Sequence, residues 1–164
     1  MAMETVESRQ YVTFGLGGEL FGVEVTRARE ILDVVSVTKV PQTPDYLLGV
    51  INLRGQVVPV VDLRVKLGMP KNETTRDTCI IVMDVLVDGE TVTVGGLADS
   101  VREVLELRDD QIEPPPRLGI KLKTEFIAGM GKVDEQFLIL LDIDRVFSSE
   151  ELAVFQDAGA TEAV

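Results

Sequence analysis

YLLGVINLRGQVVPVVDLRV, residues 46–65, aligns without a gap to FIAGMGKVDEQFLILLDIDR, residues 126–145. Nearly every apolar position stays apolar, and three identities hold the register: Gly49 with Gly129, Gln56 with Gln136, and Asp62 with Asp142. An Arg-Glu-apolar-Leu motif precedes each stretch, at residues 29–32 and 102–105. We interpret the chain as a duplicated module of about 75 residues, a longer period than solenoid repeats have.

Alternating side chains predict the strands of the first copy. Residues 11–16 and 20–25 alternate on either side of Gly17-Gly18, which indicates a β-hairpin because both turn glycines can take positive φ. Residues 27–32 suggest a short turn or helix, whereas residues 37–40, 49–54 and 56–61 suggest strands. Pro59 cannot donate a ladder hydrogen bond, which predicts that its strand is an edge or carries a bulge.

The second copy repeats this order. A hairpin is predicted across Asp88-Gly89, joining the apolar run 79–87 to the alternating residues 91–94. Further strands are predicted at 101–107, 126–133 and 136–141. Each half therefore has about five strands, and closure into a small barrel would remove the exposed edges. We expect a mainly β fold with two five-stranded barrels packed as one domain.

Composition excludes several classes of function. The 164 residues carry 16 Lys and Arg against 28 Asp and Glu, a formal charge of −12, which argues against non-specific nucleic-acid binding. Histidine is absent, so the commonest general base and zinc ligand are missing. The single cysteine, Cys79, lies in an apolar run, excludes an internal disulfide and is predicted to be a core residue. We expect neither a metal nor a cofactor.

The two ends of the chain are polar. Residues 1–8 lack the apolar stretch of a signal peptide, and charges interrupt every apolar run short of a bilayer span, so we expect a cytoplasmic protein. Ser148 and Glu151 fit a capping box, which predicts a C-terminal helix over residues 148–157. Residues 158–164 are expected to be flexible, like residues 1–8.

Two kinds of residue could act at a site. Asp62 and Asp142 occupy equivalent positions and could serve paired acid–base chemistry, but the pattern favours carboxylates that cap the turns after their strands. Arg54 ends an apolar strand beside Gly55, where it is either a solvated turn residue or an interface anchor. Glu30 and Glu103 are its candidate carboxylate partners.

Residues 49–64, GVINLRGQVVPVVDLR, resemble the central signature of the CheW family of bacterial chemotaxis coupling proteins. Residues 21–25, 30–31, 125–131 and 139–143 also match, so the resemblance covers roughly residues 9–155. It implies a CheW-like domain of two five-stranded SH3-like barrels, with approximate halves at 9–75 and 76–147 followed by the C-terminal helix.

The resemblance also implies a function. Members of the family are non-enzymatic adaptors that couple transmembrane chemoreceptors to the histidine kinase CheA, without binding nucleic acid or inserting into the membrane. They bind the receptor's cytoplasmic tip and the kinase's regulatory domain, at membrane-associated receptor arrays. Carried over by position, the receptor-binding residues are Ala28, Glu30, Gly49, Arg54 and Val104, and Glu30 is expected to pair with Arg54. The kinase-binding residues are expected at Val37, Lys39, Val40 and Pro41.

Three alternatives remain open. CheW-like domains also occur fused to receiver domains or inside the kinase, but a chain of this length favours a free-standing coupler. An enzyme using Asp62 and Asp142 would lose turnover on Asp62→Asn. A small-molecule-binding β-barrel would show a ligand-dependent shift in melting temperature.

Overall fold

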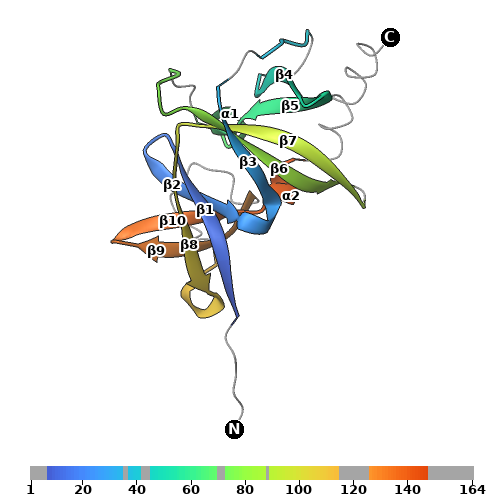
Figure 1. Cartoon of the computed structure of the whole chain (residues 1–164). Coiled ribbons are helices and arrows are strands. Elements are labelled where there is room, and N and C mark those ends of the chain that lie inside the picture. The colour runs from blue at the N-terminus through green and yellow to red at the C-terminus, as the bar shows by residue number, and fades with distance from the viewer. Residues whose placement is uncertain are drawn as a thin grey trace.

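The computed structural model describes residues 7–34, 37–41, 45–69, 73–87, 89–114 and 126–147. These residues form two five-stranded sheets (Figure 1). Sheet A has the strand order β8-β1-β2-β10-β9, and sheet B has the order β3-β6-β7-β5-β4. The strands are β1 Ser8–Leu16, β2 Glu19–Glu24, β3 Ala28–Asp33, β4 Leu47–Leu53, β5 Gln56–Asp62, β6 Cys79–Val87, β7 Glu90–Ala98, β8 Ser100–Arg108, β9 Ile127–Val133 and β10 Gln136–Leu141. The short helices are η1 Val25–Arg27, α1 Leu63–Lys66, η2 Asp109–Gln111 and α2 Ile143–Val146.

The duplication is confirmed element by element. We call β1 to β5 with α1 the first module, and β6 to β10 with α2 the second. α1 and α2 start at equivalent positions, and the backbone N–H of Asp62 donates to Tyr46 as that of Asp142 donates to Phe126. In each sheet a hairpin strand runs parallel to the last strand of a module, β2 with β10 and β7 with β5.

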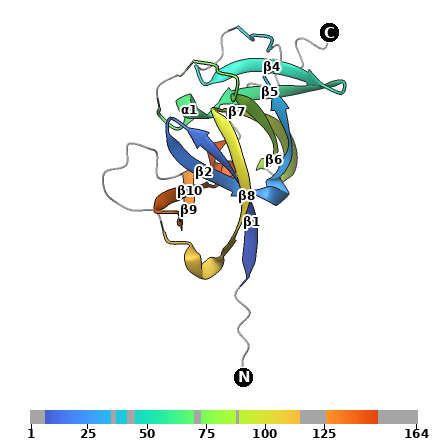
Figure 2. The same ribbon diagram turned by 60° about the vertical axis from the view of Figure 1, so that its left-hand side comes forward.

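Each sheet, however, combines strands from both modules. The hairpin β1–β2 of the first module lies in sheet A with β8, β9 and β10, whereas β6–β7 lies in sheet B with β3, β4 and β5. The sheets therefore do not follow the predicted halves 9–75 and 76–147. Figures 1 and 2 show β4 and β5 at one end of the molecule, and β9 and β10 at the other.

The exchange follows from the lengths of two connections. β3 is antiparallel to β6, and β6 to β7, so β3 runs parallel to β7. If β1–β2 took the place of β6–β7, β3 would have to run parallel to β2 in one sheet, which requires a crossover of a dozen or more residues. Only the three residues of η1 join β2 to β3, and only Asp99 joins β7 to β8. The chain must therefore pass into the other sheet.

Three sequence predictions need correction. Residues 27–32 are mostly strand, because β3 alternates half-buried and exposed side chains while pairing with β6. The predicted strand at 37–40 is a single bridge between Thr38 and Val50. Pro59 lies in β5, an interior strand, and the irregularity in its pairing with β4 is on the β4 strand. Pro59 is opposite Val50, whose N–H and C=O bond to Thr38 instead, so no hydrogen-bond donor is needed at Pro59.

The largest cluster of buried apolar side chains joins both sheets. It includes Phe14 and Phe21 of sheet A, whose rings stack at 6.1 Å, and Ile81 and Met83 of sheet B. Cys79 also belongs to this cluster, as predicted, and burial raises the pKa of its thiol. The two sheets consequently fold around a shared core as one domain. The predicted C-terminal helix, 148–157, lies outside the described residues.

Candidate functional site

The predicted pair of Glu30 and Arg54 is confirmed. The Arg54 guanidinium donates two hydrogen bonds to the Glu30 carboxylate, Nη1 to Oε1 at 2.9 Å and Nη2 to Oε2 at 2.8 Å. The Arg54 side chain is 74% exposed, and that of Glu30 is 25% exposed. β3 and β4 are the two outermost strands of sheet B. The ion pair connects β3 to the turn that follows β4, and so brings opposite edges of this sheet together.

The β4–β5 turn positions Arg54. Arg54 and Gly55 both have positive φ, 51° and 84°, as a two-residue hairpin turn with the twist of its strands requires. The Asn52 side-chain oxygen accepts the Gly55 N–H at 2.8 Å, which holds the turn closed. The guanidinium is thus presented from a tight turn at the rim of the barrel, with its direction set by two local constraints.

The ion pair also shifts the pKa of its acid. Hydrogen bonds from Arg54 lower the pKa of the Glu30 carboxyl below its ordinary value. A carboxyl whose pKa is lower in the folded than in the unfolded state stabilises the fold above the unfolded pKa, and this stabilisation is lost as pH falls through the folded pKa. Because Arg54 is exposed, water screens the pair and the stabilisation is small.

An NMR pH titration of the Glu30 carboxyl carbon tests this assignment. We expect a midpoint below that of glutamate in a peptide, and a return toward the peptide value in Arg54→Gln, because the charged donors are gone. Arg108→Gln, which removes a similarly exposed arginine on β8, serves as the control and should leave the midpoint unchanged. An equal midpoint in wild type and Arg54→Gln would contradict the assignment.

Exposed apolar side chains follow the two charged residues in the sequence. Ile31 follows Glu30 on β3, Val34 comes just after the end of β3, and Val57 is the second residue of β5; all three are exposed. Ala28 is half-buried, lies opposite Met83 and packs against the core, so it contributes little protruding surface.

Gly49 plays a backbone role in the structure. It is buried at φ 147°, at the register shift between β4 and β5. A Cβ placed there would lie 2.1 Å from the carbonyl oxygen of Thr38. The absence of a side chain therefore lets residues 37–41 run against β4, and Gly49 itself presents no side-chain surface.

The remaining predicted residues occupy two other places. Val104 is exposed on β8, in sheet A, at the position equivalent to Ile31 on β3. Lys39 and Pro41 are exposed beside the outer edge of β4, whereas Val37 and Val40 pack against core clusters in sheet B and between the sheets. The predicted receptor residues are thus divided between the sheets, with only Glu30 and Arg54 in direct contact.

The equivalent aspartates differ in their surroundings. Asp62 accepts the Arg64 N–H at the start of α1, as predicted for a cap, and also binds the Arg64 guanidinium. Asp142 makes no such cap bond and instead lies 3.6 Å from Arg145 Nε. Both carboxylates are held by neighbouring arginines, so they do not form a symmetric acid–base pair. Sequence reasoning missed Arg64, although the Asp-x-Arg spacing was the available signal.

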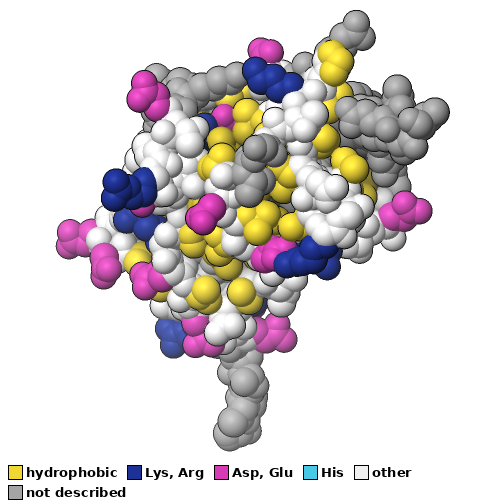
Figure 3. Space-filling view, turned by 45° about the horizontal axis from the view of Figure 1, so that its top comes forward, with side chains coloured by type: hydrophobic (Ala, Val, Ile, Leu, Met, Phe, Trp, Pro, Cys, Tyr) yellow, Lys and Arg dark blue, Asp and Glu magenta, His cyan; other side chains and the backbone are white. Residues whose placement is uncertain are grey.

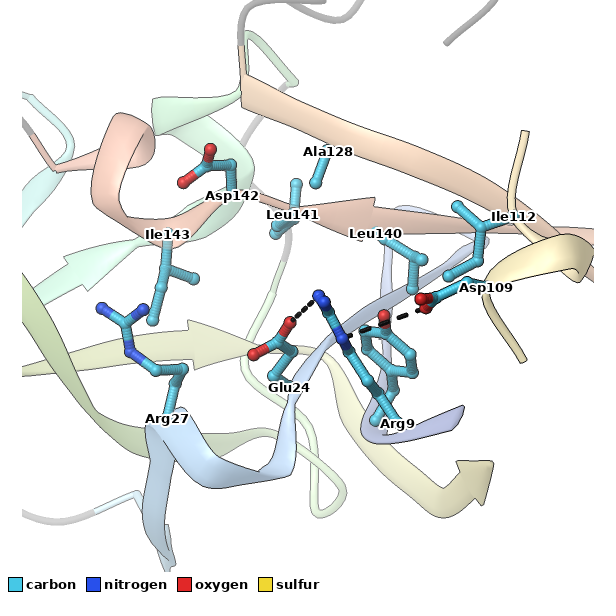
Figure 4. Close-up of a pocket in the computed structure, with 11 residues that line it drawn as sticks. Arg9, Glu24, Arg27, Asp109, Ile112, Ala128, Leu140, Leu141, Asp142 and Ile143 are labelled. Carbon is cyan, nitrogen blue, oxygen red and sulfur yellow. Dashed lines mark hydrogen bonds and ion pairs between the residues drawn. The ribbon is translucent and has the colours of Figure 1, made fainter. Parts of the chain in front are cut away.

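A cavity of about 470 Å³ opens beside β1, β2 and β10 (Figure 4). Arg9 in its wall binds Glu24 at 3.0 Å and lies 3.9 Å from Asp109, and Arg27 binds Asp144. Asp142, the remaining charged residue of the wall, lies 3.6 Å from Arg145, so each charged side chain of the wall has a partner of opposite charge. Across the ranges that the structure describes, no cluster of three or more metal-binding side chains is present. Within the same ranges, no helix has the length and hydropathy needed to cross a membrane.

Comparisons with known proteins match most of the chain. The model of the CheW-like domain matches residues 10–151. The chemotaxis protein CheW of Klebsiella aerogenes is 40% identical over 94% of this chain and 90% of its own length, and that of Rhizobium meliloti is 36% identical over 87% and 90%. The crystal structure of the scaffolding protein TtCheW from Thermoanaerobacter tengcongensis superposes with a TM-score of 0.77 at 34% identity, covering 86% of this chain and 93% of that one.

The sequence signature, the two five-stranded sheets and these relatives agree over nearly the same residues. The exposed Arg54 lies inside the stretch that carries the signature, on a turn whose geometry depends on its neighbours. This chain belongs to the CheW family of chemotaxis proteins.

Proposed function

We propose that the protein is a non-enzymatic adaptor that couples the cytoplasmic tips of transmembrane chemoreceptors to the histidine kinase CheA. Membership of the CheW family supports this role. The observation that carries the proposal is the exposed, bidentate Arg54–Glu30 pair at the rim of sheet B. Arginine, with its planar fork of donors, is enriched among the residues that anchor interfaces.

The receptor contact is centred on this pair. Ile31 on β3, Val34 just after β3 and Val57 on β5 supply exposed apolar area on the segments that follow the two charges in the sequence. Figure 3 shows one face of the molecule where apolar side chains are interspersed with single charged groups. Such a mixed surface suits the apolar face of a receptor helix that also carries polar groups. Val104 on β8 extends the proposed contact to sheet A.

The kinase contact is proposed at Val37, Lys39, Val40 and Pro41, which lie along the outer edge of β4. The Thr38–Val50 bridge fixes this segment, in which Lys39 and Pro41 are exposed. The adaptor acts from the cytoplasm at receptor arrays. Many weak contacts in such an array gain avidity from high effective concentration, so neither contact has to be tight.

Isothermal titration calorimetry with a CheA regulatory domain and a receptor cytoplasmic fragment tests the function. We expect micromolar binding to each and simultaneous binding of both, since the two proposed surfaces use different elements. Binding to neither partner, with cognate pairs from the source genome, would overturn the proposal and favour a ligand-binding barrel or a carboxylate enzyme.

Arg54→Glu is expected to weaken receptor binding about tenfold or more while leaving the fold intact, because it places two like charges at the anchor. Calorimetry measures the affinity, and thermal unfolding checks the fold. Arg108→Glu makes the same charge change at an exposed arginine of β8 that pairs with Asp110, and is the matched control. The reversed pair Glu30→Arg with Arg54→Glu is expected to restore the ion pair but not receptor binding. Full receptor affinity in Arg54→Glu would contradict this surface.

A further inference from the structure

Two ion pairs occupy equivalent places in the two sheets with their charges inverted. In sheet B, Arg64 of α1 binds Asp99, which joins β7 to β8, with Nη1 2.9 Å from Oδ1. In sheet A, the residue equivalent to Arg64 is Asp144 of α2. It binds Arg27, the last residue of η1, which joins β2 to β3. Each pair thus joins the helix of one module to the hairpin connection of the other.

Each pair also ties in a hairpin. The Asp99 carboxylate accepts the Gly17 N–H in the β1–β2 turn at 2.7 Å, and Asp144 accepts the Leu86 N–H near the end of β6 at 2.8 Å. Arg27 in addition donates to the backbone carbonyl of Asp84 at 3.0 Å. All four charged side chains are at least half-buried, so water screens their interactions less than at an open surface.

The arrangement leaves two wrong assemblies open. The hairpin of each module lies in the sheet of the other module. The same exchange of hairpins is therefore geometrically possible between identical modules of two molecules. Pairing two first modules would place Arg27 against Arg64, and pairing two second modules would place Asp99 against Asp144. Both wrong assemblies bring like charges together, whereas the correct one brings opposite charges together.

We propose that this charge inversion makes the first module exchange hairpins with the second module and prevents exchange between identical modules of two copies. The inverted pairs are a specificity device, in which the repulsion in the wrong partnership matters as much as the attraction in the right one. The duplication gives such a device a use, since the two modules share a similar apolar pattern.

Refolding of the full chain tests the proposal. Arg27→Asp with Asp144→Arg keeps an ion pair in the native fold but turns both wrong partnerships into opposite-charge contacts. Arg27→Gln with Asp144→Asn is the matched control, because it retains neutral hydrogen-bonding groups and gives neither wrong partnership a like-charge or opposite-charge contact, while the Arg64–Asp99 pair stays in place. Each protein is diluted from urea at increasing concentration, and size-exclusion chromatography measures the fraction recovered as soluble oligomer.

We expect the inverted variant to form about tenfold more oligomer than wild type at equal concentration, with the neutral variant in between. Urea unfolding of the recovered monomers separates this effect from lost stability. If the neutral and inverted variants form equal oligomer, local destabilisation explains the result and the proposal fails. It fails equally if both variants refold as cleanly as wild type.

Discussion

Arg64→Met is expected to lower the free energy of unfolding by about 3–5 kcal/mol, the usual cost of leaving a buried charge without its partner. The Arg64 side chain is 3% exposed and that of Asp62 is 2% exposed. Three bonds join Arg64 to Asp62: one from the backbone N–H at 3.1 Å, and two from the guanidinium at 2.9 and 3.0 Å. The hydrogen bond with Asp62 is also the main reason why the pKa of Arg64 is raised.

Urea unfolding at neutral pH measures this loss. Arg145→Met is the control: its side chain is 70% exposed, and it lies in the equivalent helix next to Asp142, so a change within about 0.5 kcal/mol is expected. Adding Asp62→Asn to Arg64→Met removes the stranded carboxylate and should recover part of the loss. A loss below about 1 kcal/mol for Arg64→Met would show that water reaches the carboxylate readily.

Gly49→Ala is expected to cost about 2–4 kcal/mol, because backbone strain and a backbone clash add at one position. Its φ of 147° disfavours any side chain, and the new Cβ would lie 2.1 Å from the Thr38 oxygen. Relief would require residues 37–41 to move from β4 and break the two 2.8 Å hydrogen bonds between Thr38 and Val50.

Two other glycines separate the causes in the same unfolding experiment. Gly55 has φ 84° but open space around it, so Gly55→Ala carries strain alone, about 1 kcal/mol. Gly129, the equivalent of Gly49, would meet the Ile112 side chain at 2.6 Å and the Glu113 oxygen at 3.2 Å, without positive φ. We expect Gly49→Ala to cost the most of the three. An equal cost at Gly49 and Gly55 would mean that the Thr38 segment gives way freely.

The Gly49 result also affects how binding data are interpreted. Gly49 was carried over from the family as a receptor-binding residue. A substitution at Gly49 can nevertheless reduce receptor binding by displacing residues 37–41, without any contact between residue 49 and the receptor. A Gly49 variant that loses receptor binding together with stability would assign it a structural role. Loss of affinity at full stability would instead assign a direct contact through the backbone.

The sequence by itself determined most of the strands, the duplication and the family. Apolar side chains recur at every second position along β1 and β2, a local pattern that needs no knowledge of partners. The strand at residues 28–33 was not predicted, because charged side chains on the outer face of an edge strand resemble those of a turn or a short helix. The Glu30–Arg54 pair could be proposed because both residues belong to the family pattern.

Only the tertiary structure decided which hairpin joins which sheet, and which side chains meet as a result. The short connections that force the exchange are present in the sequence. Their lengths can be predicted reliably only when the ends of the strands are known to within a residue. Arg64 with Asp99, Arg27 with Asp144, and Gly49 beneath Thr38 are contacts between distant segments. Their energies depend on burial, and burial is a property of the packed sheets rather than of any local stretch of chain.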